Sequence, residues 1–134
     1  MADRLILTLA ILGGTGKQGR GLAYRWAKAG YHVIIGSRTP KKAYQAAEQL
    51  NQRLDRQLVE GMGNEQAAEA CDIAVLSVPY PSQQETLASV KHQLDGKVLI
   101  AVTNPLNRQD IYAVHMPPAG SAAQEAQEQL GNGT

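Results

Sequence analysis

Three glycines in the stretch Gly14-Thr15-Gly16-Lys17-Gln18-Gly19 have the spacing G-x-G-x-x-G. An apolar run at 5–12 precedes them, and a pattern typical of a helix follows them. In that context the first glycine permits a tight turn, and the second lets the backbone approach a pyrophosphate. Unpaired amides and the dipole at the helix N-terminus attract the same group. The stretch therefore predicts a dinucleotide site.

A second short stretch, Gly36-Ser37-Arg38, indicates which dinucleotide binds. A site for NAD usually carries Asp or Glu about 20 residues after the glycine loop, where the carboxylate binds the ribose hydroxyls. Here the position offers a hydroxyl and a guanidinium, which bind a 2′-phosphate that a carboxylate would repel. Lys42 lies one helical turn beyond Arg38 and adds a charge, and Lys41 is a looser candidate. The sequence therefore favours NADP(H) over NAD.

Strands and helices that could position these residues alternate along the whole chain. We expect strands at 5–12, 32–35, 57–60, 73–78 and 97–102, each read from a short apolar run. We expect helices at 17–29, 40–50, 64–70, 81–94 and 121–130, with Asn64 and Ser121 as N-caps. This alternation predicts an α/β fold, a Rossmann-type doubly wound parallel sheet in three layers.

The last expected helix is followed only by Gly-Asn-Gly-Thr, where another strand would be usual. We therefore expect one NADP-binding domain over 1–134, a sheet that lacks its last strand or strands, and self-association as a homodimer.

Composition excludes several classes of function. Thirteen Lys and Arg against twelve Asp and Glu give a net charge of +1, so we expect no nucleic-acid partner, and any functional positive charge must be local. The single Cys71 excludes a disulfide framework and fits a cytoplasmic protein. The run at 5–12 is far shorter than the roughly 20 residues that span a bilayer, so we expect no membrane partner.

Three longer stretches resemble the NADP-binding domain of the F420-dependent NADP reductases, which transfer hydride between NADP and a deazaflavin coenzyme. They are ILGGTGKQGRGLAYRWAKAGYHVIIGSR, GMGNEQAAEACDIAVLSVPY and PPAGSAAQEAQ. The resemblance implies an NADP(H)-dependent oxidoreductase with coenzyme F420 or a flavin-like acceptor as second substrate. Family members continue beyond the last stretch into a region that shapes the deazaflavin pocket and the dimer.

The resemblance also implies a role for individual residues. It places Thr15, Gly16, Lys17 and Gln18 on the pyrophosphate, and Ser37, Arg38 and Lys42 on the 2′-phosphate. It places Val78, Pro79 and Tyr80 beside the nicotinamide, with Thr103-Asn104-Pro105 as the facing lip.

No catalytic side chain is assigned, because hydride transfer to a flavin or deazaflavin ring is chemistry that the cofactors carry. Two alternative functions therefore stay open. One is an NADPH-binding or redox-sensing module without turnover, and the other is an atypical short-chain reductase. Tyr24 and Lys28 have the Y-x-x-x-K spacing of short-chain reductases. They lie in the first expected helix, however, whereas the catalytic pair of those enzymes lies on a helix much later in the chain. His32, His92 and His115 lack metal-ligand spacing, so we expect no metal site; His115 lies in a loop that could cover the nicotinamide.

Overall fold

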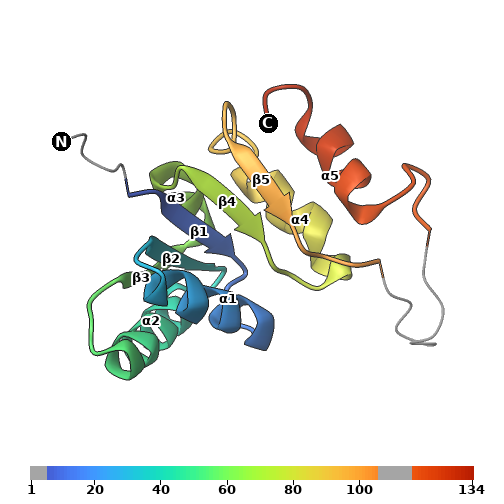
Figure 1. Cartoon of the computed structure of the whole chain (residues 1–134). Helices are drawn as coiled ribbons and strands as arrows, with labels where there is room; N and C mark the ends of the chain where they lie inside the picture. The colour runs from blue at the N-terminus through green and yellow to red at the C-terminus, as the bar shows by residue number, and fades with distance from the viewer. Residues whose placement is uncertain (1–5, 106–115) are drawn as a thin grey trace.

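A five-stranded parallel sheet forms the centre of the molecule in the computed structural model, which describes residues 6–105 and 116–134 (Figure 1). The strands are β1 (Thr8–Leu12), β2 (His32–Ser37), β3 (Val59–Gly63), β4 (Ile73–Leu76) and β5 (Val98–Ala101). The helices are α1 (Lys17–Lys28), α2 (Pro40–Leu54), α3 (Asn64–Ala70), α4 (Tyr80–Val90) and α5 (Ala122–Leu130). Elements alternate along the chain, as predicted.

The order of the strands is β3-β2-β1-β4-β5, and every neighbouring pair is parallel. From β1 the chain builds outward through β2 to β3 and then returns to the other side of β1 with β4. The carboxyl ends of β1 and β4 therefore lie next to each other at the point where the order reverses, which is where open α/β sheets bind ligands. The Rossmann-type architecture predicted from the sequence is confirmed.

Helices cover both faces of the sheet, which gives the three layers. Ile11, Ile35 and Val75 pack on the side of α1 and α2, against a row of alanines from these two helices. Leu12 and Leu76 pack on the opposite side, with apolar residues of α3, α4 and α5. Because neighbouring side chains of a strand alternate between faces, each nearly continuous apolar run supplies both cores.

Some predicted boundaries differ from the observed ones. The strand predicted at 73–78 ends at Leu76, so Ser77, Val78 and Pro79 leave the sheet before α4 begins. The strand predicted at 57–60 is observed at Val59–Gly63. There the side chain of Asn51 accepts hydrogen bonds from the Leu58 and Val59 amides (3.1 and 2.9 Å) and donates one to the Val59 carbonyl (2.8 Å), which fixes β3 to α2.

Candidate functional site

The glycines of the loop after β1 have different structural tasks. Gly13, the residue before the G-x-G-x-x-G stretch, has a φ of +70° and so supplies the positive dihedral of the turn. A Cβ on Gly14 would lie 2.8 Å from the Ile11 carbonyl oxygen, and one on Gly19 would lie 2.7 Å from the Gly14 Cα. The Gly14 amide also donates to the Gly36 carbonyl at 2.9 Å. Gly14 and Gly19 are therefore needed for close packing between β1, β2 and α1.

Gly16 is different, because nothing in the part of the chain that the structure describes requires a glycine there. It is the N-cap of α1, with extended dihedrals (φ −75°, ψ 173°) that any residue adopts, and a Cβ placed on it would meet no atom within 4 Å. No side chain caps α1. The start of α1 therefore combines uncapped first-turn amides with open space beside Gly16, which suits a bound anion.

A cavity of about 390 Å³ lies in front of this helix end and reaches the carboxyl ends of β4 and β5. The predicted site residues that line it are Gly16, Lys17, Gln18, Val78, Pro79, Tyr80 and Asn104. The Thr103 hydroxyl donates to the Val78 carbonyl at 3.0 Å, which joins the two facing segments. The structure thus brings Gly16, Lys17 and Gln18 and the predicted nicotinamide residues to one cavity, whereas the predicted Gly14 and Thr15 do not line it.

A separate cavity of about 480 Å³ lies at the end of β2, lined by Ser37 and Arg38 together with residues that begin α2 and α3, the carboxylate Glu65 among them, and by Ser89 of α4. Ser37 is buried, and its Oγ accepts a hydrogen bond from the Thr39 amide at 3.0 Å, so its hydroxyl proton stays available for an outside acceptor. Arg38 is exposed. Lys42 is exposed on the first turn of α2 and does not line this cavity, so the structure brings together only two of the three predicted 2′-phosphate residues.

Asn64 has a different task from the one that we predicted for it. The prediction that its side chain caps α3 is wrong, because Gly63 is the N-cap and Asn64 is the first residue of the helix. Its Oδ1 instead accepts a hydrogen bond from the Gly13 amide at 3.2 Å, and a Cβ on Gly36 would lie 2.7 Å from the same oxygen. Asn64, at the start of α3, is therefore bonded to the glycine loop and packs closely against Gly36 near the end of β2.

Tyr80 is held in place by Glu125, a residue of α5 that the sequence did not single out. The phenol donates to the carboxylate, with O–O distances of 3.0 and 3.2 Å. Burial of the phenol and its hydrogen bond to Glu125 raise the pKa of Tyr80, so the group stays protonated at neutral pH. Glu125 thus anchors α5 to the wall of the cavity that contains the predicted nicotinamide residues.

Among the described residues, those considered for other kinds of chemistry do not line the cavity of Val78 and Tyr80. Tyr24 and Lys28 line a groove between α1 and α2, and neither lines the cavity of Val78 and Tyr80. Cys71 is buried, and burial raises the pKa of its thiol. His32 and His92 are exposed, and His115 lies outside the described residues.

The described residues contain neither a metal-ligand cluster nor a membrane-spanning helix. Within 6–105 and 116–134 no group of three or more His, Cys, Asp or Glu could hold a metal ion. In the same part of the chain no helix has the length and hydrophobicity that a membrane crossing requires.

Comparison with known sequences finds one matching family. The family described as "NADP oxidoreductase coenzyme F420-dependent" matches residues 8–105. An F420-dependent NADP reductase of Methanothermobacter marburgensis is 48% identical over 75% of this chain, and one of Methanocaldococcus jannaschii is 37% identical over 92% of it. The chain spans 46% and 58% of the length of these two relatives.

A solved structure with the same overall fold has a similar description. A candidate F420-dependent NADP reductase from Arthrobacter sp. FB24 superposes with a TM-score of 0.74 at 26% identity, over 92% of this chain and 58% of that one. The matched stretch of sequence runs from β1 through β5. It thus includes the glycine loop, the tip of β2 and the segment after β4.

Proposed function

Because the chain belongs to the coenzyme F420-dependent NADP oxidoreductase family, we propose that it binds NADP(H) for hydride transfer to or from coenzyme F420. The observation that carries the proposal is that Gly16 to Gln18 and Val78 to Tyr80 line one cavity at the switch point of the sheet. In this assignment the pyrophosphate lies against the amides of α1, and the nicotinamide lies against the segment between β4 and α4.

Observations of this structure alone, without the relatives, support the fit of the residues present to such a ligand. The open space in front of Gly16 is a cradle that a side chain would fill. Lys17 and Gln18 supply first-turn amides and a positive charge. Arg38 and Ser37 offer a guanidinium and a hydroxyl to the 2′-phosphate, and Lys42 adds positive charge from α2.

The side chains of this cavity position and shield the reacting ring, and none needs to act as acid or base. Hydride transfer is chemistry that the nicotinamide and deazaflavin rings supply between themselves. Val78 and Pro79 offer apolar surface for one ring face, and Asn104 lines the same cavity. Tyr80, which stays protonated, is a fixed wall because Glu125 holds its hydroxyl.

Mixing the protein with NADPH and oxidised coenzyme F420 tests this proposal directly. We expect the absorbance of both to fall together, because each hydride leaves one NADPH and reduces one deazaflavin. A flavin in place of coenzyme F420 tests the breadth of acceptor. Tight binding of NADPH with no oxidation by either acceptor would contradict the reductase proposal and favour a binding or sensing module.

We further propose that the protein is a cytoplasmic homodimer. The buried single cysteine fits a reducing compartment. The edge strand β5 leaves Val98 60% and Ile100 43% exposed, which a second subunit could cover (Figure 1). Light scattering at tens of micromolar should give the mass of a dimer, and a monomeric mass would contradict this part of the proposal.

A further inference from the structure

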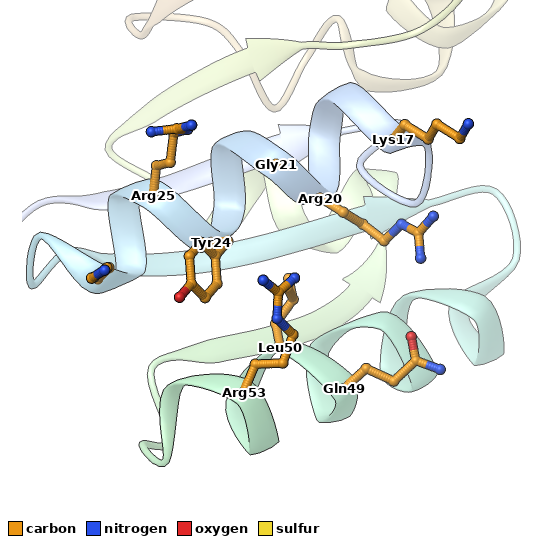
Figure 2. Close-up of a pocket in the computed structure, with 9 residues that line it drawn as sticks. Lys17, Arg20, Gly21, Tyr24, Arg25, Gln49, Leu50 and Arg53 are labelled. Atoms are coloured by element: carbon orange, nitrogen blue, oxygen red, sulfur yellow. The ribbon is translucent and has the colours of Figure 1, made fainter.

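A groove between α1 and α2 is lined by positive charge. Its volume is about 770 Å³, and five of its lining side chains are cationic, namely Lys17, Arg20, Arg25, Lys28 and Arg53. Among the residues that the structure describes, no carboxylate lines it. Figure 2 shows Arg20 pointing from α1 toward α2 and Arg53 pointing from α2 toward α1, whereas Arg25 points away from α2. We call this feature the α1/α2 groove.

These cations are not neutralised by the protein itself. Within 6–105 and 116–134 none of the five takes part in an ion pair or donates a hydrogen bond from its side chain. The Arg53 guanidinium lies 4.4 Å from the centroid of the Tyr24 ring, and the Lys28 ammonium lies 5.9 Å from it. The ring thus gathers two like charges from two helices, an arrangement that an anion in the groove would stabilise.

Gly21 adds depth to the groove. It lies in the middle of α1, where glycine makes a helix less stable than alanine does. A Cβ on Gly21 would meet nothing within 4 Å, in contrast to the tightly packed Gly19. Packing therefore does not require a glycine at this position, and the missing side chain leaves room between α1 and α2.

Positive and negative residues are concentrated in different parts of the described chain. Residues 6–58 carry nine Lys and Arg against two Asp and Glu, a net charge of +7. Residues 59–105 and 116–134 carry two against eight, a net charge of −6. The first set includes α1 and α2, and the second includes α3, α4 and α5 on the opposite face. An anionic partner would thus be steered to the α1/α2 face and repelled from the other.

We propose that the α1/α2 groove binds an acidic segment of a partner protein, a short extended run rich in Asp and Glu. Eleven helical positions separate Lys17 from Lys28, which corresponds to roughly 16 Å at about 1.5 Å per residue. An extended peptide covers that length with about five residues at roughly 3.3 Å each. Several carboxylates can therefore meet Arg20, Lys28 and Arg53 at once.

A long polyanion such as nucleic acid fits the groove less well. It would extend beyond the groove toward the half of the molecule with a net charge of −6. Nucleic-acid surfaces also present aromatic rings for base stacking, and the ring of Tyr24 is already covered by Arg53. The proposal does not depend on the reductase function, because only Lys17 also lines the cavity at the glycine loop.

Fluorescence anisotropy with a labelled hexaglutamate peptide tests the proposal on the full chain. We expect saturable binding at low salt that weakens as salt is added, and no binding of a hexaglutamine peptide. Arg20→Glu with Arg53→Glu should weaken binding about tenfold or more, because each reversal replaces an attraction with a repulsion. Gly21→Leu, which leaves the charge unchanged and fills the groove, should also weaken it by about tenfold.

Arg56→Glu is the matched control, because Arg56 is exposed in the turn after α2, close to Arg53 in sequence, but does not line the groove. It should change the affinity by less than about twofold. Circular dichroism checks that each variant is folded, and Arg20→Glu alone tests the groove without disturbing the contact of Arg53 with Tyr24. An equal loss in Arg56→Glu, no loss in Gly21→Leu, or tighter binding of a single-stranded oligonucleotide than of hexaglutamate would each overturn the proposal.

Discussion

Replacing Arg38 with alanine should remove most of the preference of this protein for NADPH over NADH. Arg38 is exposed at the end of β2 and lines one cavity with the Ser37 hydroxyl. No acceptor within the described residues engages its guanidinium, so the group is available to a 2′-phosphate. A charge-assisted hydrogen bond of this kind contributes about 1.5–3 kcal/mol, so the affinity for NADPH should fall by about 10- to 150-fold.

Calorimetric titration of each variant with NADPH and with NADH measures this preference. The affinity for NADH should hardly change in Arg38→Ala, because NADH has no 2′-phosphate. Lys42→Ala should cost less than Arg38→Ala, because Lys42 does not line the cavity. Arg56→Ala is the control for loss of a positive charge from the same half of the chain. Equal affinities for the two dinucleotides in the unmodified protein would contradict the whole assignment of the β2 tip.

The architecture could be predicted because its signals are local in the sequence. Apolar runs such as 73–76 gave the buried strands, and the glycine pattern placed a sharp turn between β1 and α1. The end of β4 was placed two residues too late, because Val78 continues the apolar run although Pro79 follows directly. Apolar character therefore located each strand better than it located the residue where pairing stops.

The contacts that hold the site together could not be predicted, because they join residues that are far apart in the chain. Asn64 bonds to Gly13 across 51 positions, and Glu125 bonds to Tyr80 across 45. An asparagine that follows a strand is a good helix cap on sequence grounds, and only the folded sheet shows that the glycine loop lies within reach of its side chain. For the same reason, the contact by which α5 supports a wall of the cavity could not be predicted from the sequence.

The glycine pattern itself separates into two classes only in the structure. Gly14 and Gly19 are required because backbone lies within 3 Å of where their Cβ would be. Gly16 has neither a positive φ nor a neighbour that would clash. A glycine that the fold does not need, at the end of a helix that no side chain caps, is best explained by a ligand that approaches the backbone there.

Gly16→Asp should therefore stabilise the fold and abolish binding of the dinucleotide at the same time. Aspartate is a preferred N-cap and its charge complements the dipole of α1, so the free energy of unfolding should rise by about 0.5–1 kcal/mol. The same carboxylate would occupy the place of the pyrophosphate and repel it. We expect the affinity for NADPH to fall by at least about 100-fold, which corresponds to roughly 3 kcal/mol.

Two further variants separate the effect of the added charge from the effect of the added side chain. Urea unfolding measures their stability, and titration with NADPH measures their affinity. Gly16→Asn keeps the cap and the volume without the charge, so it should also stabilise α1 but weaken NADPH binding less than Gly16→Asp does. Gly19→Ala should instead lower the stability, because its Cβ would lie 2.7 Å from the Gly14 Cα. If Gly16→Asp bound NADPH normally, the pyrophosphate could not lie at the N-terminus of α1, and the central assignment of the site would be wrong.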